Sequence, residues 1–498
     1  MSAHYGYVTQ LKNVKKHPNA DKLLIGECFG NNVCVNLDYY EGQVGIYFPC
    51  DLQLSVEFAT QNNLLRLKDE NGNNIGGYMD PDKRNVKAIK LRGEKSDGLF
   101  LPLSCLDYCY PDVYGGAAKV LKVGNRIDVC NGHEICKKYI PKSNRGNSNA
   151  GGTSRTRKRK VAVAPLFSEH ADTEQLAYNL SAFRPGDEIE ITLKMHGTSQ
   201  RTGYLPVLKG YKRTLKDRIF RKEGEPIYDW GYVTGTRRTV LDDYEGGYYG
   251  SNEFREAHSK LFEGRLWRGE TVYYEVVGFT TNGSPIMGVC NNKKLNDKDF
   301  VKRYGEITTF SYGCDPDGCK DGELVKFATN AEGDKLMSFT QLPQSDIYVY
   351  RMTMTNEDGD VVEYTPDFMR YRCEQMGVKT VPLFAKGKIA MSGLVNLIDY
   401  RTEEDFIVAE GDETREGDPL SYEYLPGESV KKAAEIFYDG PDPVGKIHVR
   451  EGVVVRIINR PKFTAYKHKN FSFKVLEGII KESATAPDME EAQEVENE

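Results

Sequence analysis

The stretch DEIEITLKMHGTS, residues 187–199, decides the fold of this chain. Every second residue of its first half is apolar: Ile189, Ile191 and Leu193. That period of two is typical of a β-strand with one face turned to a core, and it leaves Lys194 on the polar face at the end of the strand. Gly197 follows three residues later and gives the turn a position without a side chain, where a nucleotide can approach the backbone closely. The string K-x-x-G is common by chance, so the rest of the chain has to support it.

Length and composition indicate a multidomain intracellular protein. The 498 residues, 39% of them hydrophobic, suffice for two to four domains. The mean hydropathy is −0.56 and the chain has no apolar run of about 18 residues, which excludes a membrane-spanning helix. The start, MSAHYGYVTQLKN, lacks the parts of a secretory signal. We therefore expect a soluble cytoplasmic protein. The run RTRKRK at 155–160 is typical of a nuclear-import signal, a nucleic-acid contact or a solvated basic run.

Cysteine content and net charge exclude few further classes of intracellular protein. Eleven cysteines, an odd number in a chain without a secretory signal, indicate free thiols. Cys314 and Cys319 in GCDPDGCK could hold a metal, but no second pair accompanies them, so a metal pair and two loop thiols both stay open. The net charge of −6 is concentrated in residues 483–498, which hold six acids and no base. The neutral remainder still allows a basic groove for nucleic acid.

Changes in composition predict the domain boundaries. Gly, Ser, Asn and Arg replace apolar residues at 141–163, which we interpret as a flexible basic linker. Residues 1–140 hold short apolar runs separated by Gly, Asn and Pro, as in a small β-barrel. Residues 164–482 mix alternating strands with helical patterns and predict an α+β domain. The helical patterns lie at 172–180, 367–377 and 429–438. The tail, 483–498, lacks aromatic residues for packing and is expected to be disordered.

Motifs across the chain resemble those of the covalent nucleotidyltransferases. KMHGTS, residues 194–199, resembles their first motif in the form found in RNA ligases, with His196 where DNA ligases and capping enzymes usually have Asp. YVTGTRR resembles the segment whose arginine meets the donor phosphate, and Arg237 fits better than Arg238. YYEVVG resembles the third motif, whose glutamate, here Glu275, contacts the ribose and the metal.

Three further motifs follow in the order of the family. IYVYRM resembles the strand whose aromatic ring stacks on the adenine, and the match favours Tyr350 over Tyr348. HVREGVVVR matches the fourth motif, E-G-x-V, with Glu451 as the metal-associated carboxylate. YKHKN supplies the K-x-K of the fifth motif, and its spacing puts the amines of Lys467 and Lys469 on one face of a strand. Six motifs in order over some 275 positions make a joint accident improbable.

The resemblance covers nearly the whole chain and implies its fold. The chain resembles the ATP-dependent RNA ligases of the RNA ligase 2-like, OB-tailed (Deinococcus-type) branch. Two phrases, HPNADKL at 17–23 and KLRGEKSDGL at 90–99, resemble the OB module of that branch. The implied fold is α+β: a nucleotidyltransferase of the DNA/RNA ligase type, with ATP-grasp-like antiparallel sheets and flanking helices, preceded by an N-terminal OB-fold β-barrel. Residues 279–345 and 401–446 look like insertions relative to compact members.

The resemblance also implies an RNA ligase that seals 3′-OH and 5′-phosphate ends in three steps. Lys194 takes AMP from ATP and releases pyrophosphate, AMP moves to the RNA 5′-phosphate, and the 3′-hydroxyl displaces it. The residues made catalytic in this way are Lys194, His196, Arg237, Glu275, Glu451, Lys467 and Lys469. Those assigned to the nucleotide are Leu193, Gly197, Glu275, Tyr350 and Lys467. Glu275 and Glu451 would hold Mg²⁺ or Mn²⁺, because a hard cation prefers carboxylate and phosphate oxygens.

The chemistry of the first step requires cations around Lys194. Only an unprotonated lysine amine is a nucleophile, and neighbouring positive charges favour the loss of its proton. Lys467, Lys469, Arg237 and the metal ion are the candidates. The same charges would neutralise the phosphorus oxygens in the transition state, so one set of cations would serve both needs.

Two other classes of protein remain open. A DNA ligase or capping-type enzyme uses similar motifs but usually carries an OB domain after the fifth motif, whereas 29 residues follow Lys469, fewer than the roughly 50 that a domain needs. A non-catalytic RNA- or tRNA-binding protein with a degenerate transferase domain would be expected to have lost one of Lys194, Glu275 and Glu451. The expected partners are RNA ends in nicked or duplex RNA, or RNA on a DNA template, with no membrane partner, bound by a monomer.

Overall fold

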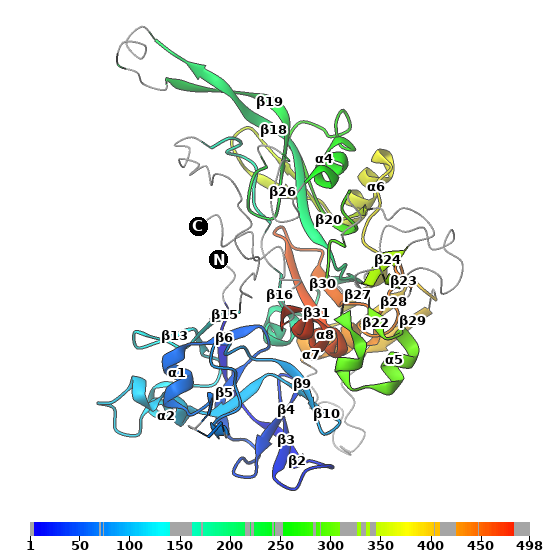
Figure 1. Cartoon of the computed structure of the whole chain (residues 1–498). Coiled ribbons are helices and arrows are strands. Elements are labelled where there is room, and N and C mark those ends of the chain that lie inside the picture. The colour runs from blue at the N-terminus through cyan, green and yellow to red at the C-terminus, as the bar shows by residue number, and fades with distance from the viewer. Residues whose placement is uncertain are drawn as a thin grey trace. The chain divides into compact units, whose positions relative to one another are not determined.

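The computed structural model of the chain divides into two compact units, which we describe separately (Figure 1). The structure describes residues 4–68, 71–72, 74–139, 162–170, 173–214, 220, 224–241, 244, 252–281, 285–288, 290–308, 326–329, 335–338, 345–402, 404–408, 425–446 and 448–482. The first unit comprises Met1–Ser143, Cys290–Glu306 and Phe471–Asp488, and the second comprises Asn144–Val289, Ile307–Asn470 and Met489–Glu498. Three stretches that are distant in sequence therefore build the first unit.

The first unit consists mainly of short antiparallel strands. Among the described residues, four strands form a sheet in the order β11-β5-β1-β12: β1 (Gly6–Gln10), β5 (Val44–Phe48), β11 (Leu99–Pro102) and β12 (Arg126–Ile127). A second sheet contains β2 (Lys12–Lys16), β3 (Leu23–Cys28) and β4 (Asn31–Asn36). Strand pairs are β6 (Leu52–Leu54) with β15 (Cys136–Lys138), β7 (Arg66–Lys68) with β8 (Asn74–Gly76), β9 (Ala88–Leu91) with β10 (Glu94–Asp97), and β13 (Val129–Cys130) with β14 (His133–Glu134). The remaining elements are α1 (Val56–Gln61), η1 (Leu103–Cys109), α2 (Ala117–Val120), β21 (Cys290–Asn291), η4 (Asn292–Leu295), α5 (Lys298–Tyr304) and α8 (Phe471–Glu482).

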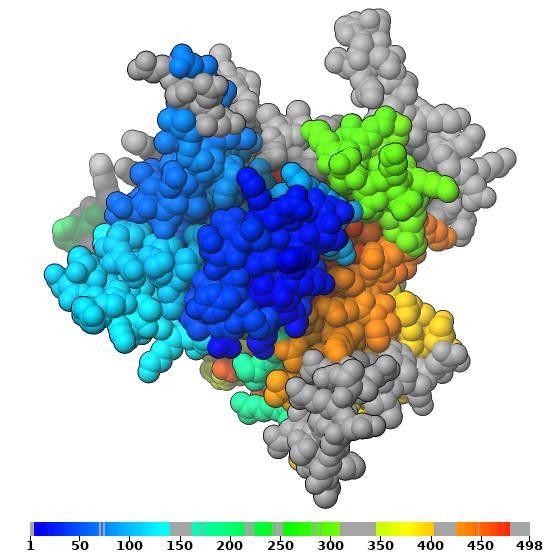
Figure 2. Space-filling view, turned by 90° about the horizontal axis from the view of Figure 1, so that it is seen from below, coloured from blue at the N-terminus to red at the C-terminus, as the bar shows by residue number. Residues whose placement is uncertain are grey.

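The strands expected from the apolar runs of the first 140 residues are confirmed. Strands β3, β4, β5 and β11 coincide with those runs, and their apolar side chains form a core that includes Ile46, Phe48 and Phe58, each fully buried. Figure 2 shows the described residues among the first 140, coloured blue to cyan, gathered together. Because the pairings of the described strands fall into separate sheets and not into one ring, the OB barrel stays a prediction.

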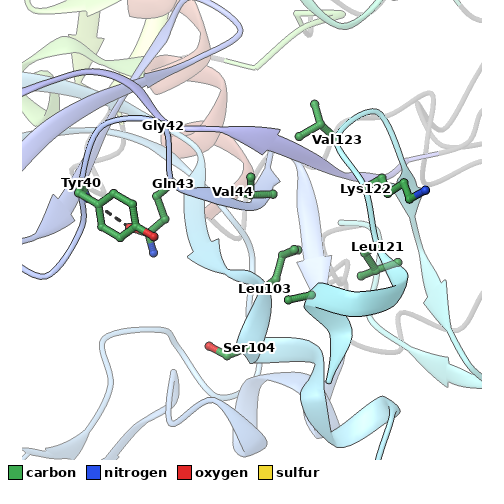
Figure 3. Close-up of a pocket in the computed structure, with 10 residues that line it drawn as sticks. Tyr40, Gly42, Gln43, Val44, Leu103, Ser104, Leu121, Lys122 and Val123 are labelled. Carbon is green, nitrogen blue, oxygen red and sulfur yellow. Dashed lines mark hydrogen bonds between the residues drawn. The ribbon is translucent and has the colours of Figure 1, made fainter. Parts of the chain in front are cut away.

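A cavity of about 580 Å³ opens at the surface of the first unit. Val44, Leu103 and Leu121 line it, and Tyr40 and Lys122 lie at its margin (Figure 3). None of the residues predicted to form the active site belongs to this lining.

Ion pairs hold the three stretches of the first unit together. Lys474 on α8 lies 2.6 Å from Asp97, whose second oxygen accepts a hydrogen bond from the Cys50 thiol at 2.9 Å. Lys90 on β9 pairs with Asp297, the residue that caps α5. The predicted boundaries at 140, 163 and 482 stay predictions, and the first unit takes in α5 and α8 in addition to the N-terminal strands.

The described residues of the second unit form two large sheets and one further strand pair. Among the described residues, the five-stranded sheet has the order β19-β18-β20-β25-β26: β18 (Thr198–Lys212), β19 (Glu225–Gly235), β20 (Glu270–Gly278), β25 (Ser345–Thr355) and β26 (Val361–Glu363). The seven-stranded sheet has the order β16-β31-β30-β17-β27-β28-β29: β16 (Glu174–Gln175), β17 (Glu188–Leu193), β27 (Leu383–Ile389), β28 (Val395–Asp399), β29 (Glu404–Val408), β30 (Gly452–Ile457) and β31 (Thr464–Lys469). All pairs in these sheets are antiparallel except β16 with β31, so the expected α+β class with antiparallel sheets is confirmed. Smaller strands are β22 (Ile307–Thr308), β23 (Lys326–Thr329) and β24 (Lys335–Ser338).

Two helices of the second unit, α4 (Glu253–Lys260) and α6 (Pro366–Met376), pack on the apolar face of the five-stranded sheet (Figure 1). The other described helices of this unit are η2 (Leu176–Tyr178), η3 (Leu180–Ala182) and α7 (Pro426–Phe437), and α7 contacts strands of the seven-stranded sheet. Phe254 of α4 and Met369 of α6 pack on Val272 and Val349 of the sheet. The helices expected at 367–377 and 429–438 are confirmed as α6 and α7. A Thr365 cap and a proline at the first turn fix the start of α6, and Gly377 ends it in the left-handed conformation.

The helix expected at 172–180 is wrong. Strand β16 and two short 3₁₀ helices, η2 and η3, occupy the described part of this segment. Glu174 and Gln175 pair with Tyr466 and Lys467 of β31, so their backbone is already committed to the sheet. Tertiary pairing has overridden a local helical pattern.

Several expectations lie outside the described residues. These include the Cys314 and Cys319 pair, the basic run at 155–160 and the acidic tail at 483–498. The nine described cysteines are free thiols. No helix in the described part of the chain is long and apolar enough to span a bilayer.

Candidate active site

Lys194 stands where strand β17 ends. Its backbone N–H donates to the Gly452 carbonyl at 3.0 Å, and Leu193 before it donates to the Pro382 carbonyl at 2.9 Å. The strand is therefore hydrogen-bonded on both sides up to the lysine. The Lys194 side chain is 23% exposed and places Nζ 2.8 Å from Oε1 of Glu451. The backbone pairing of β17 thus positions the lysine amine next to a carboxylate that is only 2% exposed.

Three neighbouring strands bring distant motifs to this carboxylate. Strand β30 lies between β17 and β31, and Gly452 at its start is opposite Lys469 at the end of β31. Glu451 is therefore adjacent to both strand ends, and Lys469 Nζ lies 3.2 Å from the same Oε1 that Lys194 contacts. Antiparallel register explains how residues some 275 positions apart meet at one oxygen.

The Glu451 carboxylate is held ionised. Burial by itself raises the pKa of this carboxyl, but Lys194, Lys469 and His196 outweigh it and keep the pKa well below the ordinary value. The Nδ1 atom of His196 contributes a contact of 3.2 Å to Oε2. Two ammonium groups thus face one carboxylate, an arrangement with surplus positive charge that suits a phosphate group.

Gly197 allows the chain to approach strand β20 closely just before β18 begins to pair with it. A Cβ atom at this position would lie 2.3 Å from the Val276 carbonyl oxygen and 2.9 Å from Cγ of Glu275. In the structure the backbone of β20 approaches this glycine closely, and the close approach of a nucleotide stays a prediction. The glycine therefore brings the first motif against Glu275 on the neighbouring strand.

The polar face of the five-stranded sheet continues the site. Ser199, Glu275 and Tyr348 are opposite one another on adjacent strands, so their side chains share one face. A bulge in β25 shifts the register at Tyr350, so that Val349 is opposite Tyr274 and Arg351 is opposite Tyr273 of β20. The Tyr350 hydroxyl lies 2.8 Å from Ser199 Oγ. Tyr348 is only 7% exposed, whereas Tyr350 is half-buried. Tyr350 is thus the more accessible ring, and it is tied to the first motif.

His170 is a neighbour of Tyr350 that the sequence did not indicate. The two rings lie 5.0 Å apart, and Arg351 contacts His170 Nδ1 at 3.3 Å. The backbone N–H of His170 donates to the carbonyl of Arg237 at 3.2 Å, which links the turn after β19 to the same cluster. The role predicted for Arg237 at the donor phosphate stays a prediction.

Arg201 fixes the turn that carries Arg237. Its guanidinium is 1% exposed and donates to backbone carbonyls of two segments, at Phe167, Ser168, Thr236 and Arg238. Sequence reasoning missed this residue because a lone arginine inside a strand carries no motif.

The structure brings four of the predicted residues to one point. They are Lys194, His196, Glu451 and Lys469. Lys467 lies two residues before Lys469 on β31, opposite Val454. Glu275 and Tyr350 lie on the five-stranded sheet beside Gly197 and Ser199. These placements agree with one site, and the chemical roles of the residues remain to be tested.

A divalent cation has two candidate carboxylates here, Glu275 and Glu451. Both oxygens of Glu451 are already in contact, Oε1 with two amines and Oε2 with His196. Among the described residues, no group of three or more His, Cys, Asp or Glu side chains could cage an ion. The two carboxylates are donors of the kind that a hard cation takes, and such a cation would keep most of its waters and take further ligands from phosphate oxygens.

Comparison with known proteins gives similarity only at the level of solved structures. No family model matches this chain, and no curated protein matches it either. Solved structures that resemble it include several of an RNA ligase from Naegleria gruberi. A lysine-to-alanine mutant of Naegleria gruberi RNA ligase with ATP and Mn has 14% identity and a TM-score of 0.46, covering 95% of this chain and 98% of that one. A lysine-to-methionine mutant of the same ligase with AMP and Mn has 14% identity and a TM-score of 0.47, covering 94% and 97%.

Proposed function

We propose that this chain is an ATP-dependent RNA ligase that joins 3′-OH and 5′-phosphate ends through a covalent Lys194-AMP intermediate. One observation carries the proposal: the amines of Lys194 and Lys469 share one oxygen of the buried, ionised Glu451. A lysine that only occupied the surface before a turn would not be expected to pair with a buried carboxylate that a second lysine also contacts. The order of the six motifs, which resembles that of RNA ligases, supports the same assignment.

In the first step, Lys194 Nζ attacks the α-phosphorus of ATP. A P–N bond forms, the bond to pyrophosphate breaks and the amine loses its proton. Glu451 orients the amine at 2.8 Å, but a carboxyl whose pKa lies well below the ordinary value is a weak base. The proton therefore passes to water, to which the partly exposed Lys194 side chain has access.

Lys469 and Lys467 stabilise the charge that develops on the phosphate. Positive groups fixed before the reaction lower the barrier most, because they need no reorganisation when charge appears. Lys469 is fixed by its contact with Glu451, and both lysines lie on β31 two residues apart. Tyr350 is assigned to the adenine, against which an aromatic ring can stack.

The two later steps transfer AMP and seal the strand. An oxygen of the RNA 5′-phosphate attacks the phosphorus of Lys194-AMP, the P–N bond breaks and the lysine amine is restored. The RNA 3′-hydroxyl then attacks the activated 5′-phosphate, a phosphodiester bond forms, and AMP leaves with the bonding electron pair while the hydroxyl proton is released.

ATP and a divalent cation, Mg²⁺ or Mn²⁺, are the proposed cofactors. Glu275 and Glu451 would hold the cation through its waters and the phosphate oxygens. When bound, the cation supplies positive charge that neutralises the triphosphate. We assign the chain to the OB-tailed branch on the two N-terminal phrases at 17–23 and 90–99, and nicked RNA duplexes, or RNA on a DNA template, are its proposed substrates.

A panel of nicked duplexes tests the choice of substrate. Each duplex carries RNA or DNA on the 3′-hydroxyl side and on the 5′-phosphate side of the nick, and sealing is measured with ATP and Mg²⁺. The proposal predicts sealing when the 3′-hydroxyl side is RNA. Sealing that is equal or better with DNA on both sides would contradict an RNA ligase and favour a DNA ligase.

A further inference from the structure

Arg255 is a nearly fully buried cation beside the first motif. It lies on α4 and is 1% exposed. Its Nη2 donates to Thr198 Oγ1 at 2.7 Å, and its Nη1 donates to the Ser199 carbonyl at 3.1 Å. These two residues complete the KMHGTS string that begins at Lys194. A guanidinium from a separate helix therefore holds the end of the lysine-bearing segment.

The contact is reciprocated. The side-chain amide of Gln200 donates to the carbonyl of Arg255 at 2.9 Å, so α4 and the start of β18 are joined in both directions. A fork of donors bound to a hydroxyl and a carbonyl fixes both direction and distance, which a single ammonium group does not. The first three residues of β18 thus have one position relative to α4.

The position of Thr198 and Gln200 against α4 also fixes Ser199 on the polar face of the five-stranded sheet. Thr198 and Gln200 point towards α4, whereas Ser199 between them points to the opposite face, where its hydroxyl meets Tyr350 at 2.8 Å. Gly197, immediately before Thr198, lies against the backbone of β20. A shift of Thr198 and Ser199 would therefore alter the hydrogen bond between Ser199 and the Tyr350 hydroxyl, and with it the place of the Tyr350 ring.

We propose that Arg255 is a positioning residue for the nucleotide site. It does not contact the nucleotide but sets the place of Ser199, and through Ser199 that of the Tyr350 ring. The inference rests on the proposed function, because it assumes that Tyr350 meets the adenine of ATP. Arg255 then governs how well ATP is held more than how fast the lysine reacts.

Kinetics of self-adenylylation in Arg255 variants test this role. Arg255→Lys and Arg255→Met are assayed with ATP labelled at the α-phosphate, at a temperature where melting curves show each variant folded. Thr198→Val adds an isosteric loss of the hydroxyl acceptor without any change at Arg255. The expected result is a KM for ATP raised about tenfold in all three variants, as the loss of a hydrogen bond to a charged group implies, with kcat changed less than threefold.

Arg372→Lys is the matched control. Arg372 is another buried arginine on a helix against the same sheet, but it binds Glu270 and the carbonyl of Arg265. It should lower the melting temperature without raising the KM for ATP. If the Arg255 variants also lose only stability and keep the wild-type KM, Arg255 is structural and the inference fails. If the wild-type protein acquires no label at all, the proposed function itself fails, so the two failures are distinguishable.

Discussion

Glu451 shows at the residue scale how the site combines burial with charge. A carboxylate with 2% exposure would ordinarily favour its neutral form, yet two lysines and a histidine hold it ionised. Removing the Glu451 carboxylate would leave the ammonium groups of Lys194 and Lys469 close together without a counter-charge between them. The same residue therefore stabilises the fold and orients the amine that is proposed to carry AMP.

Glu451→Gln should consequently affect both activity and stability. We expect self-adenylylation to fall roughly 100-fold, in line with the loss of a preorganised charge, and the free energy of unfolding to fall by about 3 kcal/mol at pH 7. The folded pKa of Glu451 lies below the unfolded value of 4.5, so its stabilising contribution is present above that pH and is lost as the pH falls through the lower folded value. Denaturant unfolding of both proteins at pH 7 and below pH 4 checks this. A stability difference that does not shrink in acid would contradict the account.

The residues with motifs could be predicted from the sequence, whereas the residues that hold them could not. Lys194, Glu451 and Lys469 stand in short strings that resemble a family, and the structure brings them together. Arg201 and Arg255 act through backbone carbonyls and a hydroxyl, contacts that any arginine can make and that leave no pattern in the chain. Their partners become visible only when the strands are paired.

At the scale of elements, the close approach of β18 to β20 decides where the first motif lies. The alternation of Ile189, Ile191 and Leu193 predicted strand β17 correctly. The polar residues between them, Glu190 and Thr192, lie on the opposite face of the strand, and they are also buried. Pairing on both sides and the ion pair of Glu190 with Arg370 account for that burial, and both lie beyond the reach of local periodicity.

Gly197→Ala tests the strand explanation of this glycine. The new methyl group would meet the Val276 carbonyl oxygen at 2.3 Å, so the backbone must shift, and we expect a loss of about 2 kcal/mol in unfolding free energy together with loss of self-adenylylation. Gly210→Ala on β18, the strand that begins directly after Gly197, is the control, because no atom lies within 4 Å of its added Cβ. Thermal melting with and without ATP separates the explanations. An unchanged melting temperature with weakened ATP binding would favour close approach by the nucleotide instead.

At the scale of the whole molecule, the composition of the first unit is the feature that the sequence did not indicate. Residues 279–345 were interpreted as an insertion, yet Cys290–Glu306 within that range belongs to the unit built on the N-terminal strands. Helix α8 joins the same unit. Contacts between segments hundreds of positions apart have no signature in local composition, whereas the strands of each segment do.

The Lys474 to Asp97 pair offers a test of this organisation. The two side chains are largely buried, at 16% and 6% exposure, so Lys474→Met should lower the unfolding free energy by about 2 kcal/mol. Asp97→Asn should lower it too, and the double variant should lose less than the sum, because the two residues are in contact. Lys137→Met, in an exposed pair with Glu134, serves as the control with little effect. Strictly additive losses would show that the pair does not fasten α8.

Covalent labelling of Lys194 tests the central claim most directly. The protein is incubated with Mg²⁺ and ATP labelled at the α-phosphate, quenched in denaturant and digested, and the labelled peptide is identified by mass spectrometry. We predict AMP on Lys194 in the wild type, no label in Lys194→Ala, and wild-type labelling in Lys388→Ala, whose side chain is 63% exposed on β27 of the same sheet. Equal labelling of the Lys194→Ala protein, or AMP found on another lysine, would contradict the account.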